Sequence, residues 1–217
     1  MEIQTIPYSE YLKEVPKTGY YILGQQTETE ILVYQAFNNQ IADYAIKNQR
    51  FGGNNYSFSR MTWIKPNFLW MMYRCGWAQK INQERVLGIW ITKTGFTKIL
   101  EESVYSSYKP EIYESKEKWK DELNKKNVRL QWDPDHDIYG EKRERRAIQL
   151  GLKNELVTDF NQNMSQKIID LTEYVEESKS KIDKGKIESL SIPKETIFRT
   201  ENEDLNNKLN LEKEHHT

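Results

Sequence analysis

The residues best suited to chemistry lie in one stretch of the chain, Ser59 to Arg74, in which cations stand among aromatic rings. Arg60 and Lys65 flank Trp63, with Thr62 beside it. Guanidinium and ammonium groups bind phosphate, and an indole ring stacks on a base, so this pattern is typical of a nucleotide or nucleic-acid site. The alternative is that the cations only decorate a surface while the tryptophans fill a core. For Arg60 and Lys65 the residues leave both interpretations open.

The spacing around Trp63 predicts how these side chains are presented. If residues 56–64 are extended, alternate side chains share a face, which groups Arg60 with Thr62 and groups Trp63 with Lys65. Pro66 fits the first turn of a following helix, over Asn67–Arg74, because its missing N–H is not needed there. A helix N-terminus attracts anions, and the two nearby cations strengthen that pull. The segment therefore predicts a phosphate site at the start of a helix.

A second concentration of chemical groups is the segment Gln131 to Asp137, with three aspartates and His136 in seven residues. Carboxylate oxygens suit a divalent ion or acid–base chemistry. Asp-Pro-Asp is also ordinary turn chemistry, and the turn is the favoured interpretation for Asp135, His136 and Asp137. The other histidines, His215 and His216, stand near the chain end, so we expect no metal site.

Gln131 and Asp133 differ from the rest of that segment because they alternate with apolar residues. Val128, Leu130 and Trp132 share one face of a predicted strand, and Gln131 and Asp133 share the other with Arg129. Polar groups on a covered strand face need partners, so these two side chains are candidates to point into a cleft. Tyr34 and Gln35 give a weaker signal, since Gln35 is polar near the end of an otherwise apolar strand.

Several other chemistries have no motif in this chain. It has no Gly-x-Ser-x-Gly elbow, no Walker-type lysine loop and no dinucleotide glycine fingerprint. The one cysteine, Cys75, has no histidine near it in sequence and is expected to be a small buried residue. One cysteine also excludes an internal disulfide and a cysteine cluster for zinc.

The elements that must position these residues follow from hydrophobic periodicity and capping signals. Strands are expected at residues 20–23, 30–37, 56–64, 85–92, 128–133, 146–152 and 164–171. Pro134 is expected to end the fifth of these strands. Helices are expected after the N-cap candidates Asn38 and Ser115, at 67–74 with Gly76 as the left-handed cap, at 96–102 and at 172–184.

Strands and short helices mix without regular βαβ repetition, so the fold class is predicted to be α+β. We expect a single domain over residues 20–190, with a mostly antiparallel sheet and short flanking helices. Residues 1–19 are expected to be a lead-in segment. Residues 191–217 are polar with scattered leucines and are predicted to form a disordered tail.

Composition narrows the class of protein further. The chain has 217 residues and a net charge of -1, yet residues 51–100 hold seven basic groups against one acid and four of the six tryptophans. No apolar run is long enough to span a membrane, and the N-terminus lacks the layout of a signal peptide. Together with the single cysteine, this predicts a cytoplasmic protein without membrane attachment. The sequence does not determine its oligomeric state.

The blocks just described resemble those of the domain of unknown function 4291 family over roughly residues 20–180. The resemblance is carried by Val33–Phe37, by Arg60–Pro66 with Phe68–Arg74, by Gln131–Pro134 and by Ile148–Leu152. The chain departs from the family pattern near Leu23, where an arginine is expected, and at Asp135-His136, where a Glu-Arg pair is expected. The resemblance names a family and implies no established reaction.

The order of the blocks is also similar to that of ADP-ribosyltransferase-like proteins. That similarity implies NAD as cofactor, held by residues of the first strand and the second block, here Tyr34, Gln35, Arg60, Thr62, Trp63 and Lys65. It implies a catalytic role for a residue on a late strand, here Gln131 or Asp133, that supports an oxocarbenium-like ribose as nicotinamide leaves. A glutamine where a glutamate is usual weakens this implication.

Two alternatives of other classes stand beside a transferase. One is a non-enzymatic module that binds a nucleotide or RNA, with the basic segment on phosphates and the tryptophans stacking on bases. The other is a structural protein whose tryptophans all belong to the core. Fold resemblance does not decide between these functions, so the geometry of the site must.

Overall fold

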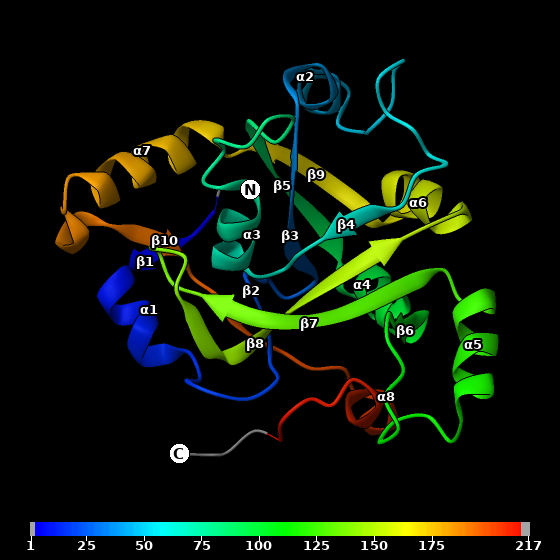
Figure 1. Ribbon diagram of the computed structural model, residues 1–217. Coiled ribbons are helices and arrows are strands. Elements are labelled where there is room, and N and C mark those ends of the chain that lie inside the picture. The colour runs from blue at the N-terminus through cyan, green and yellow to red at the C-terminus, as the bar shows by residue number, and fades with distance from the viewer. Residues whose placement is uncertain (1–2, 214–217) are drawn as a thin grey trace.

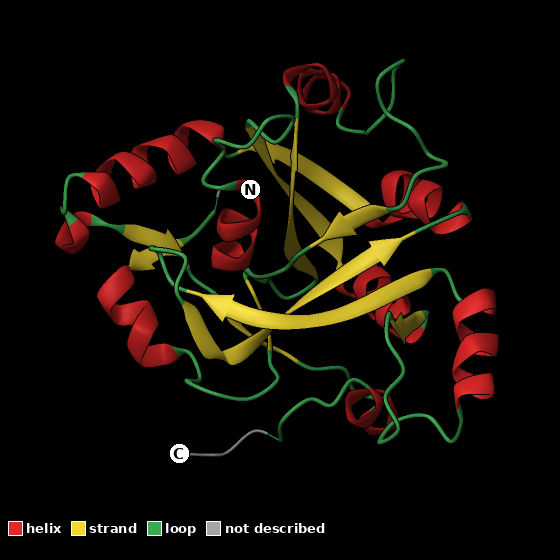
Figure 2. Cartoon of the chain, viewed as in Figure 1, coloured by secondary structure: helices red, strands yellow, loops and turns green. Residues whose placement is uncertain are grey.

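The computed structural model describes residues 3–213, so His215 and His216 lie outside the described part of the chain. Over this range the chain forms eight α-helices and eleven strands, drawn in Figure 2. No helix within residues 3–213 is long and apolar enough to cross a membrane. The helices are α1 (Tyr8–Glu14), α2 (Asn39–Asn48), α3 (Phe68–Cys75), α4 (Lys93–Glu101), α5 (Lys116–Lys125), α6 (Glu155–Asp159), α7 (Thr172–Asp183) and α8 (Glu203–Lys208).

The strands are short, and most pair in antiparallel fashion. They are β1 (Thr5–Pro7), β2 (Ile22–Gly24), β3 (Glu30–Phe37), β4 (Thr62–Ile64), β5 (Arg85–Thr92), β6 (Ser103–Tyr105), β7 (Val128–His136), β8 (Lys142–Leu152), β9 (Ser165–Asp170), β10 (Ser191–Pro193) and β11 (Thr196–Phe198). A π-helical turn at Phe160–Met164 follows α6, and a 3-10 turn at Ile187–Ser189 follows α7.

Two larger sheets organise the molecule (Figure 1). One has the strand order β4-β8-β7-β6, in which β6 and β7 are parallel and the other pairs antiparallel. The other sheet is antiparallel, with the order β3-β5-β9. Two small ladders, β1 with β10 and β2 with β11, connect the ends of the chain. This confirms the predicted α+β class and mostly antiparallel pairing in a single domain.

The two larger sheets meet where β3 passes β4. Tyr34 and Lys65 exchange both backbone hydrogen bonds, Tyr34 N–H to Lys65 O at 2.7 Å and Lys65 N–H to Tyr34 O at 3.3 Å. The Gln35 side chain adds bonds from its Nε2 to Thr62 Oγ1 at 2.6 Å and to Trp63 O at 3.1 Å. The junction therefore fixes β4, and with it Trp63 and Lys65, against the first long strand.

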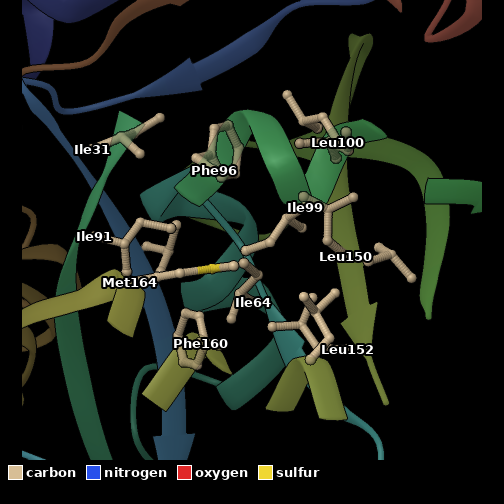
Figure 3. Packing of buried hydrophobic residues seen from close by; sticks show 14 of the residues in the cluster. Ile31, Ile64, Ile91, Phe96, Ile99, Leu100, Leu150, Leu152, Phe160 and Met164 are labelled. Carbon is tan, nitrogen blue, oxygen red and sulfur yellow. The ribbon is translucent and has the colours of Figure 1, made fainter. Parts of the chain in front are cut away.

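The main hydrophobic core fills the space between the two sheets (Figure 3). Side chains of β3 and β5 face those of β4 and β8, and α4 with the turn after α6 completes the cluster. The residues labelled in Figure 3 are Ile31, Ile64, Ile91, Phe96, Ile99, Leu100, Leu150, Leu152, Phe160 and Met164. A second cluster packs α1, α3 and α7 against the opposite face of β3 and β5. Burial on both faces explains why β3 and β5 read as continuous apolar runs.

Capping signals place three helix ends correctly, whereas the strand expected at residues 56–64 begins only at Thr62. The side chain of Asn38 caps α2, that of Ser115 caps α5, and Gly76 ends α3 in the left-handed conformation with φ of 58°. Pro66 differs from its predicted place, because Asn67 is the N-cap of α3 and Pro66 precedes it. Asn67 accepts a hydrogen bond from Trp70 N–H at 2.7 Å, which fixes the first turn.

Pro134 does not end β7, which continues to His136 through a register shift. Ser106 N–H donates to Leu130 O, so the backbone of Leu130 points to the side of β6. Strand alternation points the backbone of Pro134 to that same side, beyond the end of β6. The missing N–H of Pro134 therefore interrupts no ladder bond, and the proline protects an open strand edge from further pairing.

The prediction of a disordered tail from residue 191 is wrong for the described part of that segment. Strands β10 and β11 and helix α8 occupy it, and Phe198, Leu205 and Leu209 are buried in the main core. The lead-in is ordered as well, since β1 pairs with β10 and Tyr11 of α1 is fully buried. Apolar residues in these segments are sparse in sequence, but nearly all of them reach a core, with Leu12 as an exposed exception. This is sufficient to order a segment that other elements already flank.

Candidate functional site

A basic and aromatic cleft of 690 Å³ opens on the face of the four-stranded sheet that is turned away from the main core. We call it the cleft. It brings together Gln35, Arg60, Thr62, Trp63, Lys65, Gln131 and Asp133, which are seven of the eight residues singled out from the sequence. The further lining residues are Ala36, Phe37, Met61, Trp70, Met71, Tyr73, Arg74, Gln83 and Gln149.

The floor of the cleft follows from strand register. Gln131 of β7 lies opposite Gln149 of β8, and Trp63 of β4 lies opposite Gly151 of β8. Directly opposed residues present their side chains on the same face of a sheet. The polar positions that alternate with apolar ones in these strands therefore form one continuous polar surface, while Leu130, Ile148 and Leu150 form the core on the other face.

Gly151 gives Trp63 its place on this floor. A Cβ at Gly151 would lie 2.9 Å from Cε2 and Cζ2 of the Trp63 indole and 2.8 Å from the sulfur of Met61. A Cβ atom does not approach other heavy atoms this closely in proteins. The indole therefore lies directly against the backbone of Gly151. The pairing of Trp63 with Gly151 explains two features of the sequence at once. One is a glycine inside a strand, and the other is a tryptophan in a polar segment.

Gln149 holds the carboxylate at the end of the floor. Its Nε2 donates to Oδ2 of Asp133 at 2.8 Å and to Oε1 of Gln131 at 2.8 Å. Both N–H bonds of one amide are thereby used, and the orientation of the two acceptors is fixed. Asp133 keeps its other carboxylate oxygen without a hydrogen-bonded partner among residues 3–213, available to a ligand.

Lys65 is the buried cation of the cleft. Its side chain is 5% exposed, and its Nζ has no hydrogen bond or ion pair within the described chain. Its pKa is lowered to about 8, mainly by burial and in addition by charge repulsion from Arg74, while Cys75 and Asp133 oppose the shift. The residue is buried, but its Nζ keeps some solvent access through the cleft, so the unpaired ammonium is only partly desolvated. Its positive charge favours the entry of an anion.

Arg60 and Arg74 flank Lys65 from the loop before β4 and from the last turn of α3. Both side chains are exposed, and neither guanidinium has a hydrogen bond or ion pair in the part of the chain that the structure describes. Helix α3 packs against both β3 and β7 (Figure 1). Arg74, in its last turn, therefore lines the cleft. Three cations therefore face one carboxylate, Asp133, and the cleft attracts anions.

Gln35 and Thr62 form the wall at the junction of the sheets. Both are buried, and the Nε2 of Gln35 is used by its bonds to Thr62 and Trp63. The Oε1 of Gln35 is a buried acceptor with no partner. Such an atom is costly unless water or a ligand donates to it, by about 1–3 kcal/mol.

Tyr34 is the one singled-out residue that does not line the cleft. It is fully buried, its ring meets that of Phe68 edge to face, and it belongs to the cluster behind β3. Adjacent residues of a strand point to opposite faces, so Gln35 reaches the cleft and Tyr34 cannot. Of Tyr34, only the backbone contributes to the site, through its bonds to Lys65.

The N-terminus of α3 is already occupied by a carboxyl group of the protein itself. The carboxylate of Glu195 accepts from the Phe68 N–H, from Asn67 Nδ2 at 2.8 Å and from the Tyr11 hydroxyl at 2.9 Å. The predicted phosphate site at this helix start is therefore wrong, because a residue from the supposed tail fills it. Lys65 instead points its ammonium into the cleft on the far side of the turn.

The acidic segment 133–137 separates into two parts. Asp135 is fully buried and accepts from Arg145 Nε at 2.6 Å, and Asp137 accepts from Arg143 at 2.7 Å and from backbone N–H groups of the turn at 139–141. No group of acids, histidines or cysteines within residues 3–213 is arranged to hold a metal ion. The turn interpretation therefore describes Asp137, while Asp135 belongs to a buried ion pair at the end of β7.

Of the nine lining residues that were not singled out from the sequence, three bear on the chemistry of the cleft: Gln149, Arg74 and Tyr73. Gln149 is polar between Ile148 and Leu150, which is the same alternation signal that identified Gln131. Arg74 and Tyr73 end an apolar helix, and their spacing alone does not show that the helix end reaches the sheet floor. Tyr73 also stacks on His136, with ring centroids 3.5 Å apart, which closes that end of the cleft.

Fold and site together define a single α+β domain with an anion-attracting, aromatic cleft on one sheet face. The family model of the domain of unknown function 4291 matches residues 21–198. The chain belongs to this family, and the match includes every strand of the cleft. Among curated proteins, none matches the chain.

Proposed function

We propose that the cleft binds a phosphate-containing nucleotide, with NAD as the candidate ligand. The observation that carries the proposal is the convergence of Arg60, Lys65 and Arg74, none of them paired, on one cavity with Trp63. Structural cations normally have partners, and a buried unpaired one is typical of a ligand site. Phosphate oxygens accept from guanidinium forks and from an ammonium with equal ease.

The rest of the nucleotide has matching partners on the cleft walls. The half-buried indole of Trp63 offers a flat surface for a base or a nicotinamide ring. The Oε1 of Gln35 is an unpartnered acceptor behind this wall, but it is buried, so a ligand amide or amino group would reach it only if the side chain turned toward the cleft. A cavity of 690 Å³ lies within the range typical of small-molecule sites.

The carboxylate of Asp133 supports the more specific proposal of an ADP-ribosyltransferase-like reaction. Breaking the bond between ribose C1′ and the nicotinamide nitrogen leaves positive charge on the ribose, and the bonding electrons leave with neutral nicotinamide. A carboxylate fixed by Gln149 stabilises that charge, and water or another acceptor then adds at C1′ and loses a proton. In this proposal Asp133 acts on the ribose. Gln131 accepts a hydrogen bond from Gln149 and thereby helps to position the Gln149 amide.

The second candidate, a non-enzymatic nucleotide or RNA-binding module, is favoured by the continuation of the cleft. A neighbouring hollow of 510 Å³ shares Phe37, Arg60, Met61 and Thr62 with the cleft. Its other lining residues are neutral and polar or apolar: Asn38, Ile41, Asn55, Tyr56, Ser57 and Asn82. A groove that passes Arg60 in this way has room for more than one nucleotide along a strand.

Two measurements on one protein test these candidates. A thermal-shift series with NAD, ADP-ribose and a short RNA should show stabilisation by NAD, about 2.7 kcal/mol at a hundred times the Kd. Nicotinamide release from NAD should then be detectable and should be lost in Asp133→Asn. NAD binding without release, together with salt-dependent RNA binding, supports the binding module. No shift with any of the three ligands contradicts both.

Arg60→Ala and Arg50→Ala form a matched pair of variants for this series. Arg60 lines the cleft, whereas Arg50 lies in the loop after α2, where its Nη1 donates to the carbonyl of Gln49. Arg60→Ala should weaken NAD binding while its unfolding midpoint without ligand stays unchanged, because the side chain has no partner to lose. Equal loss of binding in Arg50→Ala would show a nonspecific charge effect.

A further inference from the structure

We infer that Lys65 is a nucleophilic amine that forms an imine with an aldehyde or ketone carrying a phosphate group. This inference deepens the proposed function in one respect, since it uses the same cleft and the same arginines. It does not require that NAD be the ligand. It assigns to the cleft a covalent chemistry that ADP-ribosyl transfer from NAD does not need.

The position of Lys65 separates it from the other lysines of the chain. Among residues 3–213 it is the one buried lysine, at 5% exposed, and it lines the cleft, where its Nζ has no hydrogen bond or ion pair within those residues. The backbone bonds to Tyr34 fix its Cα at the junction of the two sheets. An amine held in this way has its lone pair free for reaction when it is not protonated.

The surroundings of Lys65 increase the fraction of its amine that is neutral, compared with an exposed lysine. Burial is the largest cause and lowers the pKa to about 8, and Arg74 acts in the same direction. At pH 7.5 a pKa of 8 leaves about a quarter of the amine neutral, against about one in a thousand for an ordinary lysine. Asp133 and Cys75 oppose the shift only in part.

The same surroundings supply what the reaction needs besides the amine. Arg60 and Arg74 are unpaired cations for the phosphate of the substrate. Nζ adds its lone pair to the carbonyl carbon, and the carbonyl oxygen takes up a proton to give a carbinolamine. Loss of this hydroxyl as water, with the nitrogen supplying the electrons, leaves a protonated imine. Asp133 is the carboxylate of the cleft that can accept the amine proton and return it to the departing hydroxyl.

Pyridoxal 5′-phosphate is a suitable probe, because it combines an aldehyde, a phosphate and an aromatic ring. The protein is incubated with the probe at pH 7.5, the imine is reduced with borohydride, and the occupancy of each lysine is measured by peptide mass spectrometry. Lys65 should be labelled at least tenfold faster than any other lysine, and pyridoxal without its phosphate should lose most of this preference. Even labelling of surface lysines with Lys65 unmodified would overturn the inference.

Variants distinguish this inference from the proposed function. Arg60→Ala should slow the labelling of Lys65, and Lys65→Arg should remove the labelled peptide, while Lys17, which lines a separate cavity, keeps its rate. The occupancies in the unaltered protein stand even if Lys65→Arg fails to fold. If Lys65 is labelled selectively but NAD neither binds nor releases nicotinamide, the imine chemistry holds and the nucleotide proposal fails. If NAD is turned over and Lys65 resists the probe, the reverse is true.

Discussion

Two regions of this molecule carry dense charge, and they differ in whether that charge is satisfied. Around the end of β7, Asp135 is paired with Arg145, Asp137 with Arg143, and the Glu195 carboxylate with three donors. In the cleft, the cations Arg60, Lys65 and Arg74 have no partner within the described residues. In the first region the acidic side chains are all paired, although both ring nitrogens of the buried His136 have no partner within residues 3–213. In the second region the charged side chains that have no partner are cations, which is the basis of the proposal that the cleft binds an anion.

The difference shows why clustered charge in a sequence does not by itself identify a site. The aspartates near His136 and the cations near Trp63 are comparable concentrations of polar chemistry in the sequence. Their partners decide their roles, and those partners come from distant segments or are missing. We call the first region the buried network and expect it to govern stability, while the cleft governs binding. Each of the following changes tests that division.

The largest effect is expected from Arg145→Ala in the buried network. The substitution leaves the fully buried Asp135 without its ion pair and removes the bond from Arg145 to the carbonyl of Pro16. We expect a loss of about 3–5 kcal/mol in the free energy of unfolding, measured by urea denaturation. Arg143→Ala is the control and should cost less, because Arg143 is half-exposed and the buried Asp137 keeps its bonds from the backbone N–H groups of Tyr139 and Glu141. Equal effects of the two would mean that burial does not distinguish them.

Glu195 predicts a pH dependence of stability. Burial raises its pKa to about 8, and the Phe68 N–H and Tyr11 hydroxyl offset this only in part. Because the folded state binds this proton more tightly than the unfolded state, stability is greatest below about pH 4.5 with respect to this group. It falls as pH rises to about 8, with a slope of at most about 1.4 kcal/mol per pH unit.

Glu195→Gln removes this titration and serves as the comparison. Urea denaturation of both proteins between pH 5 and 9 should show a smaller decline for the variant, whatever its stability at pH 5. The same slope in both would mean that Glu195 stays ionised throughout and that its three donors outweigh burial. Ligand binding in the cleft should not follow this profile, since Glu195 does not line it.

In the cleft, Arg74→Ala should weaken binding of ADP-ribose by about 10- to 100-fold, which corresponds to about 1.5–3 kcal/mol for a charged hydrogen bond. Its effect on unfolding should stay within about 0.5 kcal/mol, since Arg74 is exposed and unpaired. Isothermal titration calorimetry and urea denaturation of the same sample measure both quantities. A large loss of stability without a change in affinity would place Arg74 with the structural charges.

The smallest effect is expected from Gly151→Ala. The new Cβ must displace the Trp63 indole or the Met61 side chain, because it would lie within 3 Å of both. We expect affinity for an aromatic nucleotide to fall by about tenfold or less, and affinity for inorganic pyrophosphate, measured by the same titration, to stay unchanged. Equal loss for both ligands would show that the whole floor has moved.

Much of the fold and of the site could be predicted because the signals are local. Alternation in β7 placed Gln131 and Asp133 on one face, and the caps at Asn38 and Ser115 act within a few residues. The partner of the α3 N-terminus could not be predicted, because Glu195 lies 127 residues from Phe68 along the chain. That the last strands are ordered, rather than disordered, could not be predicted for the same reason. Their residues become buried only by joining cores that other elements build.

Tyr34 lies in the core and Gln35 lines the cleft, and the sequence alone does not predict which of the two adjacent residues does which. Both stood out from the sequence, but a fully buried strand does not reveal which of its faces meets a cleft. That choice depends on β4, whose backbone pairs with Tyr34 and brings Trp63 beside Gln35. A tertiary contact, rather than any property of the two residues, separates the core position from the cleft position.

The most direct test of the division between the two regions is the affinity of ADP-ribose for the double variant Arg60→Ala/Arg74→Ala, measured by calorimetry beside the unaltered protein and Arg50→Ala. If the unpaired cations form a phosphate site, the unaltered protein and Arg50→Ala bind with similar Kd. The double variant should lose at least about a hundredfold in affinity while keeping its unfolding midpoint. Unchanged affinity in the double variant, or no binding of ADP-ribose to the unaltered protein, would contradict the central claim that Arg60 and Arg74 form a phosphate-binding site.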